Sequence, residues 1–201
     1  MRIAAITALL AVAVITGCGG QTKSESGAQP AVTTPPTPKT QRLTWGQPAE
    51  VLGANLTKIR VTPLGVLYER GGGEVETAAN GWFVVIAVKA EALTKPDTTS
   101  GGAGGGGFEW RGAGQTINSI DGNTTTTAWI GAVPEFGITE PIEVGDPREG
   151  IETFDVPAKG GRLVYISPED YSISATWDIP AADQGSPPAL TKVRKRIKLF
   201  S

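Results

Sequence analysis

The 201-residue sequence predicts an all-β sandwich. From position 42 onward, short apolar stretches alternate with polar residues and are separated by Gly, Pro, Asn and Asp, a pattern typical of many short strands joined by turns. No stretch of this region before position 181 carries apolar residues at i, i+3, i+4 and i+7, so no helix is expected there. Strands without helices bury their apolar faces by packing as two sheets.

The N-terminus has the pattern of an export signal. Arg2 precedes an uncharged apolar run over residues 3–15, and Ile15-Thr16-Gly17-Cys18 resembles the bacterial lipobox. The resemblance implies cleavage after residue 17 and a diacylglycerol on Cys18. Two acyl chains give stable attachment, so we expect the mature chain at the extracytoplasmic face of the cell membrane.

Composition excludes most enzyme classes. The sequence has no histidine, and Cys18 is its only cysteine. Ser-His-Asp and Cys-His catalysis and His- or Cys-ligated zinc are therefore excluded. Paired carboxylates could still perform glycoside hydrolysis, but no catalytic residue is assigned, no cofactor other than the lipid is expected, and no nucleic-acid partner is expected.

Residues 18–41 are predicted to be a disordered tether. The segment is rich in Gly, Ser, Thr, Gln and Pro and has almost nothing apolar to bury. Fully extended, it would reach roughly 80 Å from the membrane.

The predicted sandwich covers residues 42–180. Residues 57–61 alternate as a strand with one buried face, and residues 82–88 are apolar on both faces, as expected of a central strand. Residues 162–166 and 173–179 provide two further strands. The glycine run at 101–107 has no following Gly-Lys-Ser or Gly-Lys-Thr, so a surface loop is expected in place of a phosphate loop.

Three stretches carry a family resemblance: residues 81–90, residues 149–157, and the closing strands up to Trp177. They resemble the telokin-like, immunoglobulin-like extracellular domain of Gram-positive, actinobacterial lipoproteins, which is related to a secreted mycobacterial immunoprotective antigen. The resemblance implies an immunoglobulin-like β-sandwich, an exported location and no established catalytic activity. The glycine loop and the basic C-terminus depart from that family.

The stretch from Glu135 to Asp155 holds seven carboxylates and one arginine, Arg148. A solvated acidic face is the simplest interpretation. The alternatives are a calcium site formed by Glu143, Asp146 and Glu149 with backbone carbonyls, or a pair of catalytic carboxylates.

The C-terminal segment, residues 181–201, is strongly basic. It is predicted to be an edge strand or a solvated arm, because apolar and basic residues alternate from Val193 to Leu199. The functional alternative is a contact with anionic lipid or wall polymer. That contact would use Lys192, Arg194, Lys195, Arg196 and Lys198.

The tryptophans divide into two groups. Trp82 and Trp177 fall in predicted strands and are expected in the core. Trp110, Trp129 and Phe136 flank loop-rich segments, where they either pack beneath the loops or form an exposed patch for a partner.

These observations together predict a lipid-anchored, non-catalytic binding module of the cell envelope, with an envelope protein or wall polymer as partner. The alternatives are a carboxylate-dependent glycan hydrolase of the cell wall and a purely structural envelope lipoprotein.

Overall fold

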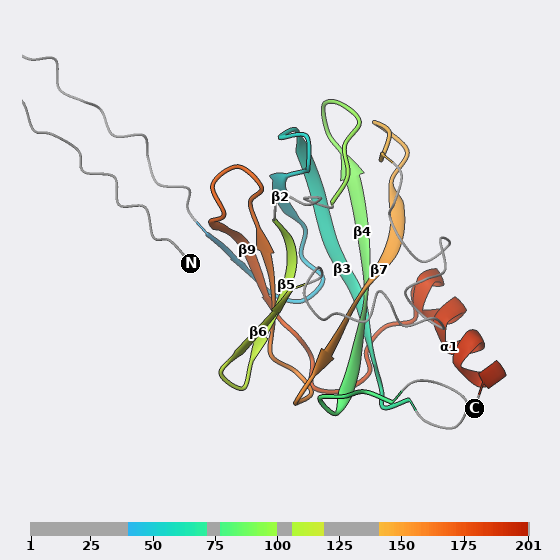
Figure 1. Ribbon diagram of the computed structural model, residues 1–201. Coiled ribbons are helices and arrows are strands. Elements are labelled where there is room, and N and C mark those ends of the chain that lie inside the picture. The colour runs from blue at the N-terminus through green and yellow to red at the C-terminus, as the bar shows by residue number, and fades with distance from the viewer. Residues whose placement is uncertain (1–39, 72–76, 100–105, 119–140, 201) are drawn as a thin grey trace, which may run out of the picture. The chain divides into compact units, whose positions relative to one another are not determined.

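Two β-sheets lie face to face and confirm the predicted sandwich (Figure 1). The computed structural model describes residues 40–71, 77–99, 106–118 and 141–200. The strands are β1 (Gln41–Leu43), β2 (Ala49–Leu52), β3 (Lys58–Glu69), β4 (Trp82–Ala92), β5 (Gly107–Gly112), β6 (Gln115–Asn118), β7 (Arg148–Val156), β8 (Arg162–Ile166) and β9 (Ile173–Asp178). A helix, α1 (Pro188–Phe200), follows the last strand.

The topology is immunoglobulin-like. One sheet has the strand order β1-β9-β8-β5-β6 and the other β2-β3-β4-β7. The pairing of β4 with β7 in one sheet, and of β8 with both β5 and β9 in the other, corresponds to the B–E and C–F–G pairings of immunoglobulin domains. Strand β1 runs parallel to β9 and extends the sheet that contains β9, β8 and β5.

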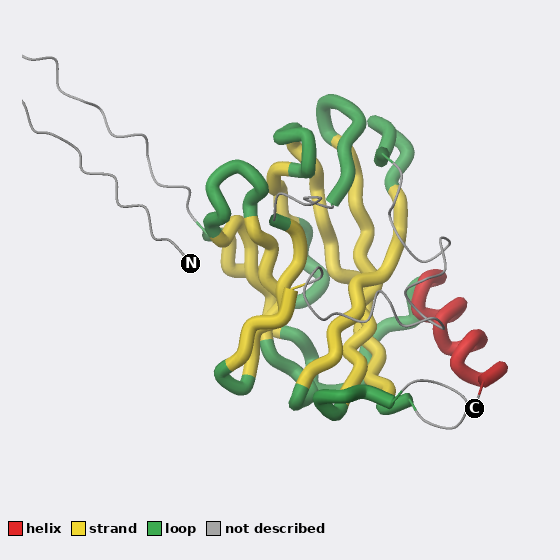
Figure 2. Tube along the Cα trace, viewed as in Figure 1, coloured by secondary structure: helices red, strands yellow, loops and turns green. Residues whose placement is uncertain are grey.

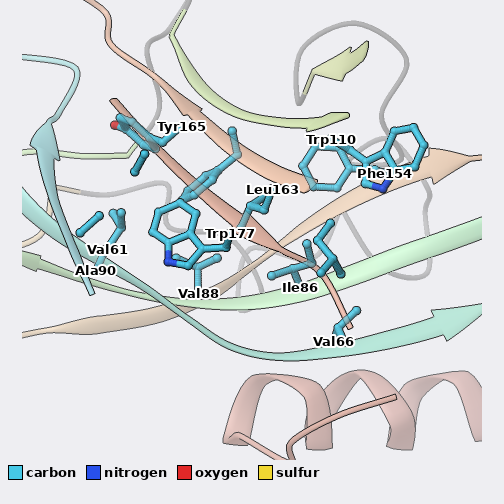
Figure 3. Packing of buried hydrophobic residues seen from close by; sticks show 14 of the residues in the cluster. Val61, Val66, Ile86, Val88, Ala90, Trp110, Phe154, Leu163, Tyr165 and Trp177 are labelled. Carbon is cyan, nitrogen blue, oxygen red and sulfur yellow. The ribbon is translucent and has the colours of Figure 1, made fainter. Parts of the chain in front are cut away.

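Strand β4 is buried on both faces, which explains its continuous apolar sequence. Val84, Ile86 and Val88 point between the sheets, where they join Trp110, Trp177 and other residues of the main core (Figure 3). Phe83, Val85 and Ala87 point outward and belong to a second apolar cluster, shared with α1. The expected central strand is confirmed, since β3 and β7 pair with β4 on either side.

The C-terminal segment is a helix, and the prediction of an edge strand or solvated arm was wrong. Figure 2 shows α1 as the red helix beside the strands. Ala189, Leu190 and Val193 are buried in the second apolar cluster, with Ile197 packed against it. These positions recur every three or four residues, so they form a stripe on one side of a helix. Considered alone, residues 193–199 alternate like a strand; the helical stripe becomes visible only when Ala189 and Leu190 are considered with them.

The connection between β9 and α1 is held against β3. The backbone N–H of Val66 donates to the carbonyl of Gln184 at 2.9 Å, and the N–H of Gln184 donates to the carbonyl of Val66 at 3.0 Å. Gly65 permits this close approach, because a Cβ at that position would lie 2.7 Å from the Gln184 carbonyl oxygen. The helix therefore starts from a fixed point on the sheet.

A buried carboxylate organises the loops at one end of the sandwich. Asp97 is fully buried, and its carboxylate accepts hydrogen bonds from the N–H groups of Asn55, Thr57 and Thr98 and from the Thr57 hydroxyl. Its backbone also exchanges two hydrogen bonds with Ile142. Four donors compensate for the burial of this charge, so we assign Asp97 a structural role.

The packing of α1 predicts unequal effects of the same substitution at two of its leucines. Leu190→Ala should lower the free energy of unfolding by about 2–3 kcal/mol, because Leu190 is fully buried against β4. Leu199→Ala serves as the matched control, since Leu199 is 79% exposed, and it should change stability little. Urea unfolding of both variants gives the comparison; equal, small losses would contradict a docked helix.

Candidate functional site

The outer side of α1 is a basic surface. Because Leu190 and Val193 face the sheet, the helical repeat turns Lys192, Lys195 and Lys198 toward solvent, and all three are exposed. Within the described part of the chain, none of these lysines forms an ion pair. We call the three residues the lysine face; no carboxylate of the described residues pairs with its charges.

The start of the helix is tied to the body of the domain. Pro188 opens α1, as is common at a first helical position, and the N–H of Ala189 donates to Glu149 Oε1 at 2.7 Å. A carboxylate at this end also interacts favourably with the helix dipole. The lysine face is thereby held in a fixed orientation relative to the sheets.

The two arginines of the helix occupy different positions from the lysines. Arg194 is half-buried, and its guanidinium donates to the Gly185 carbonyl and the Ser186 hydroxyl, each at 3.4 Å. Arg196 is also half-buried and is engaged in an interaction of its own. Of the five basic residues expected to act together, the helix therefore brings three to one exposed side.

The three acidic residues considered for calcium have different surroundings in the structure. Glu149 is occupied with the helix start, whereas Glu143 and Asp146 are exposed and lie in a turn closed by the Asp146 N–H donating to the Glu143 carbonyl at 3.1 Å. Across residues 40–71, 77–99, 106–118 and 141–200, no group of three or more acidic residues is arranged to hold a metal ion.

Trp110 is a core residue, so of its two alternatives burial is correct and a place in an exposed patch is wrong. Its side chain has no exposed surface, and its Nε1–H donates to the Gly160 carbonyl at 2.8 Å. It lies on β5, where immunoglobulin domains place a buried tryptophan on strand C. Alternation of Phe108 and Trp110 with Glu109 and Arg111 was the sequence signal for this strand. Trp129 and Phe136 lie outside the described residues.

Trp82 is a partly buried tryptophan at the opposite end of the sheet from Asp97. The guanidinium of Arg70 and the ammonium of Lys159 lie 4.2 and 4.0 Å from the centroid of its ring system. Tyr68 meets Trp82 edge to face, and the Tyr68 hydroxyl donates to the Pro180 carbonyl at 2.6 Å. Both cations already contact the indole, so we assign these cation–π and aromatic contacts around Trp82 a structural role.

Glu152 is an inward-pointing carboxyl that sequence reasoning did not single out. It lies on β7 opposite Ile86, on the same face as Phe154, so it is directed between the sheets although the residue retains some exposure. Burial raises the pKa of Glu152 to about 7. Burial, together with Asp97 and Glu152, raises the pKa of Tyr165. Strand β7 is at the edge of its sheet, where an inward charge opposes pairing with another chain.

A groove of about 430 Å³ lies between the edges of the two sheets, lined by residues of β1, β2 and the β8–β9 turn. Two of its acidic groups are already engaged. Asp170 accepts hydrogen bonds from the Ser172 hydroxyl and N–H, which lower the pKa of Asp170, and Glu50 pairs with Arg60 at 3.1 Å. Lys58 and Glu169, which also line the groove, form no ion pair with a described residue, and their opposite charges give the groove no net preference for a cation or an anion.

No protein-family model and no solved structure match this chain. Cys18 lies outside the described residues, so its lipidation remains a prediction from sequence. Among the described residues, no helix has the length and apolar character needed to cross a membrane.

The raised pKa of Glu152 predicts a specific dependence of stability on pH. Near and below pH 4.5 Glu152 is protonated in the folded state, and it contributes no penalty. As pH rises from about 4.5 to about 7, the unfolded state ionises while the folded state does not, so the free energy of unfolding falls, and above that range the loss levels off.

In Glu152→Gln, the decrease in the free energy of unfolding over this pH range should be smaller by an amount on the order of 2 kcal/mol. Urea unfolding of both proteins from pH 4 to pH 8.5 measures the difference, with Glu109→Gln on the outer face of the other sheet as control. Parallel stability curves for wild type and Glu152→Gln would show that this carboxyl is not buried in the folded state.

Proposed function

We propose that this protein is a lipid-anchored, extracytoplasmic binding module of the cell envelope and that the lysine face of α1 contacts an anionic membrane surface. The lipobox-like sequence at Cys18 supports the anchor, and the resemblance to telokin-like lipoproteins supports the same location. The observation that carries the membrane contact is the exposure of Lys192, Lys195 and Lys198, none of which pairs with a carboxylate in the part of the chain that the structure describes.

The physical basis of the contact is electrostatic. Anionic lipids give a membrane a negative surface potential, and each lysine near that surface contributes about 1 kcal/mol to binding. The three lysines lie on one side of a helix whose other side is buried, so all three can approach a surface together. Since a single lipid-modified residue already holds the chain at the membrane, even a weak additional contact would orient the domain.

Glycan hydrolysis is the second candidate, and Glu152 is the observation that favours it. A carboxyl with a pKa of about 7 is suited to act as a general acid. The mechanism also needs a second carboxylate. Among the described residues, the two carboxylates that are buried, Asp97 and Asp155, are committed to loops. Asp97 is described above, and Asp155 accepts hydrogen bonds from the N–H groups of Ala79 and Asn80 at 2.7 and 2.9 Å. A binding role is therefore favoured over a catalytic one.

The membrane contact predicts a selective loss of vesicle binding. The protein for this test begins at residue 18 with Cys18→Ser, since every contact described here lies within residues 40–200. Replacing Lys192, Lys195 and Lys198 by Gln should weaken binding to phosphatidylglycerol vesicles by about a hundredfold, because about 3 kcal/mol of attraction is removed. Cosedimentation at low ionic strength measures the partition coefficient.

The control replaces Lys58, Lys89 and Lys95 by Gln, which changes net charge equally but leaves the helix intact. It should reduce binding much less. Equal losses in the two triple variants would show that only net charge matters, and unchanged binding of the helix variant would reject the lysine face as the membrane contact. Phosphatidylcholine vesicles should bind neither protein.

A further inference from the structure

A second groove, of about 400 Å³, lies on the outer face of the sheet formed by β1, β9 and β8. Its lining is mostly polar; beside Leu43 it includes two arginines, two threonines, one amide and one carboxylate: Arg42, Arg162, Thr44, Thr176, Gln47 and Asp178. The groove is separate from the lysine face, because α1 packs on the outer face of the other sheet (Figure 1).

Strand register explains why these side chains meet. Arg42 on β1 pairs with Thr176 on β9, and Arg162 on β8 pairs with Asp178. The intervening residues, Leu43, Trp177 and Leu163, point into the main core. Since successive residues of a strand alternate between faces, the polar residues gather on the solvent side.

The arginines of this sheet face differ in how well their charge is neutralised. Arg111 on β5 is held by Glu109 through two hydrogen bonds of 2.9 and 2.7 Å. Arg162 has a single longer contact of 3.3 Å to Asp178, whose side chain is 88% exposed. Arg42 has no ion-pair partner among the described residues, and it is exposed beside the groove. Of these three arginines, Arg42 is therefore the one that forms no ion pair with a described carboxylate.

The wall of the groove next to Arg42 is rigid. The Gln47 N–H donates to the Thr44 carbonyl and the Thr44 N–H donates to Gln47 Oε1, each at 3.0 Å. Trp177, which is fully buried, donates from Nε1 to the Gln47 carbonyl at 2.8 Å. A site that is already ordered loses little conformational entropy when a ligand binds.

We propose that this groove binds an oxyanion, a carboxylate or a phosphate, carried on a hydroxyl-bearing molecule, with Arg42 as the principal charge contact. A guanidinium group matches the geometry of both oxyanions and can donate two parallel hydrogen bonds to either. Thr44 and Thr176 add hydroxyls that can bond to the rest of the ligand. Asp178 offsets the charge of Arg162 and limits affinity. The site does not depend on the membrane contact proposed for α1.

The test follows the side-chain Nε–Hε resonance of Arg42 by nuclear magnetic resonance in the full chain, purified in a neutral detergent. Glucuronate and glycerol 1-phosphate are the two anionic probes, and glucose and glycerol are their uncharged counterparts. A saturable shift with either anion and none with the uncharged counterparts is expected; which anion acts identifies the carboxylate or the phosphate as the ligand group.

Variants make the assignment specific. Arg42→Gln should weaken the anion titration, followed on the backbone amides of Thr44 and Thr176, by about tenfold, and Asp178→Asn should strengthen it severalfold. Arg111→Gln is the matched control and should leave the titration unchanged. The three substituted residues lie on the solvent side of the sheet that contains β1, β9, β8 and β5. Unchanged backbone amide resonances away from the groove would confirm that each variant is folded.

The absence of a saturable shift with both anions would overturn the proposal, as would equal responses at Arg42 and Arg111. A variant lacking the lysine face should give the wild-type anion titration, so failure of the membrane contact and failure of this groove are separate results.

Discussion

The two-sided burial of β4 is the constraint on which the rest of the structure depends. Its inner residues require a second sheet, and its outer residues, Phe83, Val85 and Ala87, require another cover. Exposed, such a surface would be an apolar patch prone to association. Helix α1 provides the cover with Leu190 and Val193, and the remaining side of the same helix is then left to face solvent. The lysine face is thus a consequence of how the core is completed.

Buried tryptophans of the core also fix the position of two loops. The indole N–H groups of Trp110 and Trp177 donate to the carbonyls of Gly160 and Gln47, which lie in connections between strands. Each bond satisfies a polar group in the core and fixes a loop at the same time. The first loop carries Lys159, which lies over Trp82, and the second forms the wall beside Arg42. Charged residues beside both loops are therefore positioned by hydrogen bonds from the core.

The sequence predicted those parts of the fold whose pattern is local. Strand β9 alternates clearly, and the continuous apolar runs of β4 and β8 indicate buried strands; the sandwich followed from these patterns. Helix α1 was missed because Val193 and Ile197 fit a strand and a helix equally well, and the exposed Leu199 extended the apparent alternation. Only the apolar outer surface of β4 decides between the two. The roles of Glu149 and Arg42 could not be predicted from a local sequence pattern. Both depend on contacts, or a lack of contacts, with residues far away in the chain.

The arrangement of charge favours a module that binds on two sides. Most cations of the described strands pair with a carboxylate of the same sheet. Glu109 pairs with Arg111, and Glu91 pairs with Lys89 and Arg60. Among the described residues, cations without an ion-pair partner include Lys58 and Lys95, the three lysines on the outer side of α1, and Arg42. The lysine face and Arg42 belong to opposite faces of the sandwich. A single anionic surface cannot contact both faces of a rigid domain. Under the proposed functions, a membrane contact through α1 leaves the Arg42 groove directed away from the bilayer, where a soluble or polymeric anion could reach it.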